Sequence, residues 1–322
     1  MKKEMIAREV NKEFNLADDE KLTRNDVYHC VREAMGRYIK VEAPISERLA
    51  FELSQRFELE NVVVRVVDVV PENWDYIAQH AAELIKEKIV SMRTLKPRPI
   101  GLGIGAGSAT LNVCRHLGKL LETSDKPISL RIFGISSGCS ATQPEYSPVS
   151  FFNLFPNHVV HSRVTLLSEP LISAARFENM KLNLGLKEAF CARNEIDIVV
   201  TSMGDFEDPH DGFKRLLEAS RPDYVPPTGQ VGNVQYRPYS DTGPVLESGD
   251  ELRVATLFEI DDLTKLATTT NKFVILIVRP CSICQKTKAK ALLPLLKVRG
   301  LRAFNHIIID SKTCRELLDL PD

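Results

Sequence analysis

Short runs of aliphatic and β-branched residues alternate with amphipathic segments along most of the chain, and this pattern limits the fold more than any other feature. The runs are apolar at nearly every residue, which is typical of strands buried on both faces. The sequence therefore predicts an α/β fold whose mainly parallel sheet is covered by helices on both faces. Strands are expected at 62–68, 100–104, 129–135, 159–167, 196–201, 273–278 and 306–309, and helices at 74–92, 108–121, 182–193 and 288–298.

One segment departs from this alternation. Residues 231–246 combine alternating polar and apolar residues with the turn sequence Asp241-Thr-Gly243. Such a pattern indicates a β-hairpin.

The first sixty residues form a different region, rich in charged residues and with apolar residues at helical spacing. Helices are expected at 5–14, from Thr23 to Gly36, and from Ser46 to 57, with a short strand at 37–42. Thr23 is a good N-cap, and Asp26 stands where a capping-box partner would. We therefore expect two domains, 1–60 and 61–322.

Charge and composition exclude several classes of protein. The net charge of −1 argues against a protein that coats nucleic acid by bulk charge. The seven cysteines are scattered and odd in number, which is typical of free thiols in a reducing compartment. The charged N-terminus lacks the apolar stretch of a signal peptide, and no run approaches the length of a membrane span. We expect a cytoplasmic protein with no membrane contact and no cofactor.

A glycine-rich turn between an expected strand and helix is the main candidate binding motif. Residues 101–110 read Gly-Leu-Gly-Ile-Gly-Ala-Gly-Ser-Ala-Thr. Backbone N–H groups at such a helix start, with the hydroxyls of Ser108 and Thr110, are suited to binding phosphate. The turn has neither a Walker lysine nor GxGxxG spacing. Its glycines also fit a tight turn that packs only against its own helix.

Polar residues follow several other strands, at the sheet edge where α/β proteins bind ligands. They lie in 136–139, 202–205 and 279–286, and ordinary loop polarity is the competing explanation. Cys281 and Cys284 have CxxC spacing, but the sequence places no further pair of zinc ligands nearby. We expect incidental thiols, with a redox role as the alternative, and no metal site. His210, between two acids, is either a base, a ligand or a solvated side chain.

Four blocks, taken in order, resemble the SorC family of bacterial transcriptional regulators. They are residues 103–111, residues 167–205, the hairpin 230–243 and the helix start 288–293. The resemblance implies a sugar- or phosphosugar-binding domain of the NagB/ribose-5-phosphate-isomerase-like fold, preceded by a helix-turn-helix. The N-terminal region resembles a truncated form of that motif.

The resemblance also implies particular site residues. An effector site is expected at Gly103, Gly105, Gly107, Ser108, Thr110, Ser136, Asp205, Asn233 and Lys288, and DNA contacts at Arg24, Asn25, Tyr28 and Arg32. Three features depart from the family pattern: an extra residue in the phosphate loop, Asn233 in place of an acid, and the CxxC segment in place of two glycines.

The function that follows is a non-enzymatic transcriptional regulator whose DNA binding responds to a small sugar or phosphosugar. Regulators of two-fold operators are dimers or tetramers, so a homo-oligomer is expected. One alternative is a sugar-phosphate isomerase-like enzyme. Another, suggested by the net charge of −2 in residues 1–60, is a regulator-derived protein that acts through protein contacts.

Overall fold

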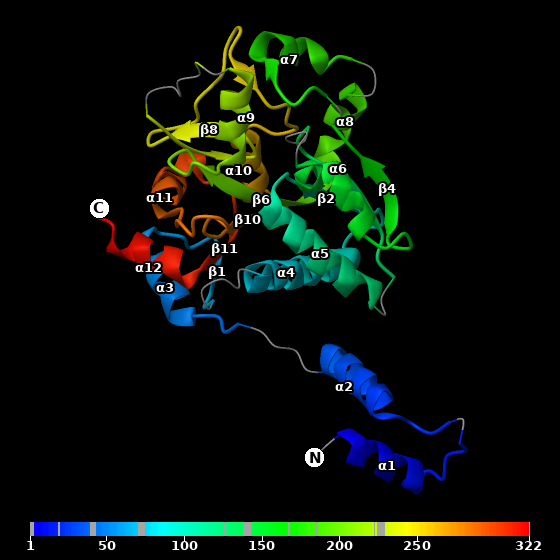
Figure 1. The fold of residues 1–322 in the computed structure, drawn as a ribbon. Coiled ribbons are helices and arrows are strands. Elements are labelled where there is room, and N and C mark those ends of the chain that lie inside the picture. The colour runs from blue at the N-terminus through cyan, green and yellow to red at the C-terminus, as the bar shows by residue number, and fades with distance from the viewer. Residues whose placement is uncertain are drawn as a thin grey trace. The chain divides into compact units, whose positions relative to one another are not determined.

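The structure is a computed structural model. It describes residues 3–18, 20–38, 43–69, 75–124, 127–137, 143–166, 168–183, 186–221, 223 and 229–321, without the side chains of 32–38. The chain forms two compact units, Met1–Ala43 and Pro44–Asp322, whose elements are drawn in Figure 1. The unit boundary therefore falls between Ala43 and Pro44 rather than after residue 60.

The smaller unit consists of helices α1 (Lys3–Glu13) and α2 (Arg24–Tyr38). Asn11 joins them through paired hydrogen bonds with the backbone of Leu22, at 2.8 and 2.9 Å. The expected capping box forms, since Thr23 and Asp26 bond each other's backbone N–H groups. Helix α2 continues through Gly36, so the strand expected from residue 37 is wrong at its start, and residues 39–42 lie outside the described part.

Helix α3 (Glu47–Arg56) belongs to the larger unit because it packs against that unit's strand β1 (Val63–Val67) and helix α12 (Ser311–Asp319). Ser46 caps the helix, as the sequence predicts. The guanidinium of Arg56 donates to backbone carbonyls at the end of α12. Residues 44–60 are thus part of the α/β unit.

Within the described residues, one nine-stranded sheet organises the larger unit. Seven of its strands run parallel in the order β1-β11-β10-β6-β2-β3-β4. Strand β7 pairs antiparallel with β6, and β8 with β7. The bounds are β2 Ile100–Ile104, β3 Leu130–Gly134, β4 Val160–Val164, β6 Ile196–Asp205, β7 Gln230–Val234, β8 Arg237–Ser240, β10 Phe273–Val278 and β11 His306–Asp310. Strands β5 (Ile172–Ser173) and β9 (Leu252–Arg253) form a separate small pair.

Helices cover both faces of the sheet, which confirms the predicted fold class. On one face, Val274, Leu276 and Val278 of β10 join a core with residues of α3, α10, α11 and α12. On the other face α4 and α5 lie side by side, as Figure 1 shows. The remaining helices are α4 Asp75–Arg93, α5 Ser108–Glu122, α6 Pro148–Phe151, α7 Ala174–Met180, α8 Leu186–Ala192, α9 Gly212–Ser220, α10 Ile260–Thr268 and α11 Ala289–Lys297, with 3₁₀ turns at Pro144–Tyr146, Phe152–Leu154, Arg193–Glu195 and Arg299–Leu301.

The hairpin predicted over 231–246 contains two reversals instead of one. The first joins β7 to β8 through Gln235 and Tyr236, whose φ angles are +55° and +61°. The second is the expected turn at Asp241–Gly243, closed by a 2.9 Å hydrogen bond from Ser240 N to Gly243 O. Two consecutive positive φ angles suit the twist of a two-residue hairpin loop, but Gln and Tyr are unusual there. The first turn was therefore not predictable from the residue types.

At the amino end of β6, the buried carboxylate of Asp197 holds three cations together. It accepts from Lys96 at 2.5 Å, from Lys272 at 2.9 Å and from both terminal nitrogens of Arg98 at 2.9 and 3.0 Å. The backbone N–H of Gly101 donates to the same group at 3.0 Å. This cluster ties β2 and β6 to the preceding loops, at the end of the sheet opposite the expected site.

No helix in the described part of the chain is long and apolar enough to cross a membrane.

Candidate functional site

A pocket with a volume of about 440 Å³, called the main pocket below, lies where β2, β6 and β10 end. This is the edge at which α/β sheets bind ligands. Four of the nine expected effector residues line it: Gly107, Ser108, Asn233 and Lys288. The other five do not.

The glycine-rich turn presents one side of the pocket. Gly107 precedes α5 with a φ of +119°, a conformation that favours glycine. Ser108 begins the helix, and its Oγ accepts a 2.6 Å hydrogen bond from Arg279 Nη2. Thr110 is buried and donates to the carbonyl of Gly107 at 2.8 Å, so its hydroxyl is used within the turn. The anion-binding capacity of this turn therefore rests on Ser108, on the backbone at the helix start and on Arg279.

Three more expected residues lie deeper in the fold. Gly103 is inside β2, where a Cβ atom would lie 2.9 Å from Ile135. Gly105 packs against Gln235, whose Nε2 atom would lie 1.7 Å from an added Cβ. Ser136 is buried and bridges to Thr256. None of the three lines the pocket.

Two half-buried cations line the pocket from the end of β10 and the start of α11. Arg279 has one hydrogen bond among the described residues, the one to Ser108. Lys288 donates to the carbonyl of Met203 at 2.5 Å. Burial lowers the pKa of both side chains, because a charge away from water is disfavoured. In Lys288 the nearby carboxylates of Asp211 and Asp208 oppose that effect.

Carboxyl and amide groups also line the pocket. Asp211 caps α9 by accepting from Lys214 N at 2.9 Å, and Asn233 Nδ2 lies 3.3 Å from its second oxygen. Burial raises the pKa of Asp211. Gln235 donates to Thr201 at 2.5 Å and fills the space above Gly105. These acceptors and donors are suited to hydroxyl groups.

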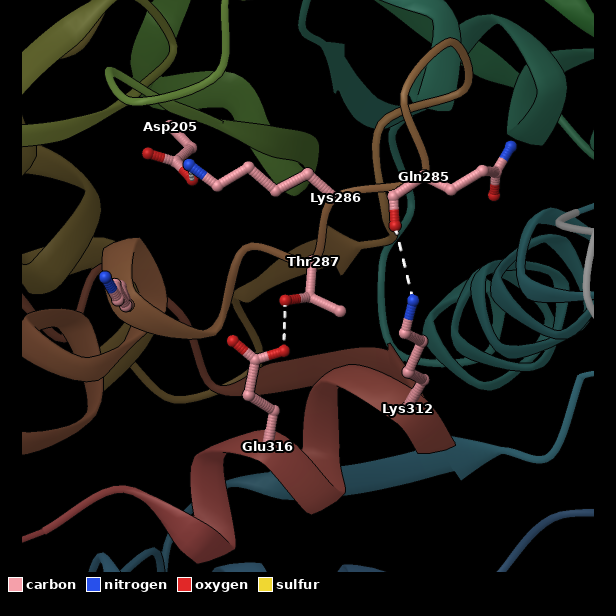
Figure 2. A pocket seen from close by; sticks show the side chains of 7 residues that line it. Asp205, Gln285, Lys286, Thr287, Lys312 and Glu316 are labelled. Carbon is pink, nitrogen blue, oxygen red and sulfur yellow. Dashed lines mark hydrogen bonds and ion pairs between the residues drawn. The ribbon is translucent and has the colours of Figure 1, made fainter.

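Asp205 lies in a second, smaller pocket of about 280 Å³. In Figure 2 its carboxylate faces the Lys286 ammonium, at 3.9 Å. The same view shows Gln285 O bonded to Lys312 at 3.5 Å and Thr287 bonded to Glu316. Asp205 Oδ1 also accepts from Glu207 N at 2.8 Å, so this residue shapes the loop after β6 and does not line the main pocket.

Sequence reasoning did not assign Arg279, Asp211 or Gln235 to the site. Arg279 directly follows β10 in a segment that the sequence did mark as a polar strand end. Asp211 precedes a helix and reads as an ordinary N-cap. Gln235 is placed by a turn with no sequence signature, so nothing in the sequence indicates that its side chain enters the pocket.

The expected DNA contacts lie on α2. Arg24, Asn25 and Tyr28 are exposed, and Arg24 pairs with Glu4 at 3.2 Å. Tyr28 and His29 rings meet edge to face at 5.8 Å. Arg32 is in the same helix, but its side chain lies outside the described part.

The sequence and the structure were compared with those of known proteins. No protein-family model and no curated protein matches the sequence. Several solved structures match. The probable sor operon regulator from Shigella flexneri has 17% identity and a TM-score of 0.61, and the match covers 84% of this chain and 98% of that one.

Two other structures match similarly well. For a DeoR family transcriptional regulator from Listeria monocytogenes the identity is 15%, the TM-score 0.59 and the coverage 84% and 98%. For the full-length sorbitol operon regulator SorC from Klebsiella pneumoniae the identity is 16%, the TM-score 0.59 and the coverage 99% and 94%. The chain thus has the fold of the SorC- and DeoR-type sugar-binding transcriptional regulators.

Proposed function

We propose that this chain is a transcriptional regulator whose α/β unit binds a small phosphorylated sugar or polyol, and whose N-terminal helices contact DNA. The structural neighbours, which are named as transcriptional regulators, support the regulator role. The observation that carries the ligand class is that two half-buried cations and several hydrogen-bonding carboxyl and amide groups line the same pocket.

The phosphate would bind at Arg279, Lys288 and the start of α5. Arg279 has five N–H donors and uses one on Ser108, so the others are available to an anion. Lys288 adds a second half-buried positive charge, and the α5 N-terminus adds partial positive charge. Sugar hydroxyls would then bond Asp211, Asn233 and Gln235, which line the same pocket. Such a ligand would pair with both the cations and the hydrogen-bonding groups of the pocket.

The ligand is tested by isothermal titration with sorbitol 6-phosphate, fructose 6-phosphate, the two unphosphorylated compounds and inorganic phosphate. A charge-assisted hydrogen bond contributes about 1.5–3 kcal/mol, so Arg279→Met and Lys288→Met should each weaken phosphosugar binding roughly 10- to 100-fold. Lys290→Met is the matched control, because Lys290 is exposed and pairs with Glu207 outside the main pocket. Equal affinity of the wild type and the Arg279 variant for every phosphorylated compound would contradict the assignment.

DNA contact is tested separately. Duplexes selected by the purified protein from a random library should bind through α2, with Arg24, Asn25 and Tyr28 nearest the bases. Charge reversal of Arg24 and Arg32 should weaken binding and reduce its dependence on salt. Arg115→Glu, on the exposed side of α5, serves as the control. If no duplex is selected, the regulator-derived protein that acts through protein contacts becomes the better explanation.

A two-fold operator requires at least a dimer. We therefore expect light scattering at micromolar concentration to give a multiple of the 36.2 kDa chain mass.

A further inference from the structure

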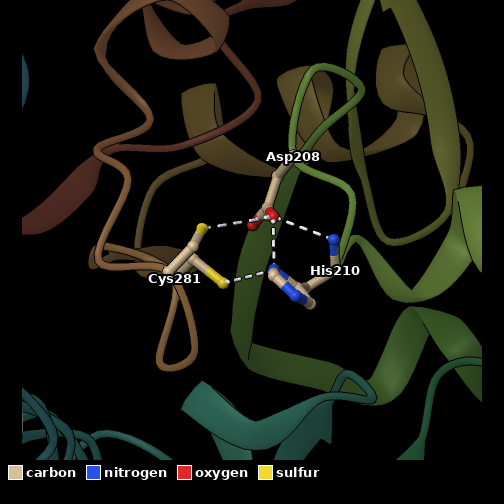
Figure 3. Close-up of side chains that lie close together, drawn as sticks. Asp208, His210 and Cys281 are labelled. Carbon is tan, nitrogen blue, oxygen red and sulfur yellow. Dashed lines mark hydrogen bonds and ion pairs between the residues drawn. The ribbon is translucent and has the colours of Figure 1, made fainter.

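Four side chains of metal-binding type meet at the rim of the main pocket. Asp208 and His210 come from the loop after β6, and Cys281 and Cys284 from the loop after β10. Their ligand atoms all lie within 4.8 Å of one another. Figure 3 shows Asp208, His210 and Cys281 pointing toward a common centre. The CxxC pair thus gains the two further ligands that sequence spacing did not provide, because they come from a segment about seventy residues earlier.

The distances suit a tetrahedral ion. His210 Nδ1 lies 3.2 Å from Asp208 Oδ1 and 3.7 Å from Cys281 Sγ, and Cys284 Sγ lies 3.7 Å from Asp208 Oδ1. Zinc bonds sulfur at about 2.3 Å and nitrogen or oxygen at about 2.0–2.1 Å. Tetrahedral ligands are then about 3.3 Å apart for a nitrogen–oxygen pair and about 3.5 Å apart when one is sulfur. The three separations agree with those values to within a few tenths of an ångström.

The two loops hold these ligands in place without help from a metal. Cys281 N bonds Lys286 O at 2.9 Å and Gln285 N bonds Cys281 O at 3.0 Å, which closes the CxxC loop on itself. On the facing loop, Asp208 accepts from His210 N at 2.9 Å. Ligands fixed by their neighbours in this way lose little freedom when an ion binds.

The donor set selects among metals. Two thiolates and an imidazole are soft or intermediate ligands, which favour Zn²⁺ over the hard cations Mg²⁺ and Ca²⁺. Asp208 and Cys281 are buried, whereas Cys284 is exposed and leaves a route for the ion to enter. We propose that Asp208, His210, Cys281 and Cys284 form a four-ligand Zn²⁺ site that joins the loop after β6 to the loop after β10. This proposal does not depend on the ligand of the main pocket.

The test uses the full chain, stripped of metal with a chelator under reducing conditions and then titrated with Zn²⁺ or Co²⁺. Elemental analysis should give one zinc per chain after gel filtration. Co²⁺ should produce the sulfur-to-metal charge-transfer band and the visible spectrum of a tetrahedral site. The Cys284→Ser and His210→Ala variants should each weaken Zn²⁺ binding at least about tenfold in competition with a chelating dye.

Cys191→Ser is the matched control, since Cys191 is an exposed thiol elsewhere in the chain and its loss should leave affinity unchanged. Circular dichroism of the metal-free variants checks that they are folded. Absence of the sulfur-to-cobalt band in the folded wild type would overturn the proposal, as would Zn²⁺ affinity that survives in both the Cys284 and His210 variants. Peptide mapping that finds a Cys281–Cys284 disulfide persisting under reducing conditions would also overturn it.

Discussion

Replacing Asp197 by asparagine removes the negative charge that pairs with Lys96, Arg98 and Lys272 at the amino end of β6. The amide has nearly the same shape, but its NH₂ group would face N–H donors. The hydrogen bond from Gly101 N, by contrast, still has an oxygen to accept it. The substitution therefore tests the charge more than the packing.

The structure sets the size of the effect. Breaking a buried ion pair by removing one partner costs about 3–5 kcal/mol. The Asp197 side chain has no exposure, but those of Lys96, Arg98 and Lys272 are 19%, 39% and 15% exposed, so water compensates the cations in part. We therefore expect a loss near the lower limit, about 3 kcal/mol. At about 2–4 °C per kcal/mol this lowers the Tm by roughly 6–12 °C.

Urea unfolding followed by circular dichroism measures this loss, and its pH dependence gives an independent check. Burial alone would raise the pKa of Asp197, but the hydrogen bonds from Lys96, Gly101, Lys272 and Arg98 outweigh it and lower the pKa. A carboxyl with a lowered pKa stabilises the folded state above its unfolded pKa, and that contribution is lost as the pH falls through the folded pKa.

The difference in free energy of unfolding between the wild type and the Asp197→Asn variant should therefore be constant above about pH 5 and decrease below about pH 4. Asp241→Asn, at an exposed turn, should change stability by less than about 0.5 kcal/mol. A loss below about 1 kcal/mol in a variant with the wild-type spectrum would refute the reasoning.

Two further substitutions address packing and titration. Gly118→Ala should lower the free energy of unfolding by about 1–3 kcal/mol although alanine favours helices, because the added Cβ would lie 2.0 Å from the carbonyl oxygen of Leu154. Gly212→Ala is the control, since a Cβ at that position meets open space. A Gly118 variant that is more stable than the wild type in thermal unfolding would contradict the contact. Burial is the main reason that the pKa of His306 is lowered to about 4. As the pH falls, the unfolded chain therefore takes up the His306 proton at a higher pH than the folded chain does, and the free energy of unfolding should fall by about 1–2 kcal/mol between pH 7 and pH 5. His306→Gln should flatten that part of the pH profile in urea unfolding, and an unchanged slope would show that other groups cause it.

Continuous apolar strands were predictable from the sequence. Phe273–Val278 matches its predicted strand residue for residue, because a β-branched run bounded by Lys272 and the Arg279-Pro280 pair has few alternatives. Helix starts with a side-chain cap were equally readable, as at Ser46 and Thr23. The helix expected at 182–193 is shorter, since α8 covers Leu186–Ala192 and the chain then tightens into a 3₁₀ turn.

The site was less predictable. Strand ends indicated the edge of the sheet at which the main pocket lies, and the predicted residues Ser108 and Lys288 line that pocket. Which other side chains line the pocket depends on their burial and on their hydrogen-bond partners, and both are set by segments far away in the sequence. The Thr110 hydroxyl bonds the carbonyl of Gly107 within its own turn, and Arg279 bonds Ser108, which is 171 residues away in the sequence. The predicted strand 159–167 ends at Leu167, and the predicted helix 74–92 begins at Trp74. Both residues lie outside the described part of the chain.

The contact between Gly105 and Gln235 links two positions that are far apart in the chain. Any side chain at 105 needs the space that the Gln235 amide occupies, and shortening Gln235 removes its hydrogen bond to buried Thr201. A single change at position 105 is therefore costly, whereas a change accompanied by a smaller residue at 235 keeps the volume constant. In homologous sequences, positions 105 and 235 should therefore covary: glycine at 105 with a long amide at 235, or a larger residue at 105 with a shorter one at 235.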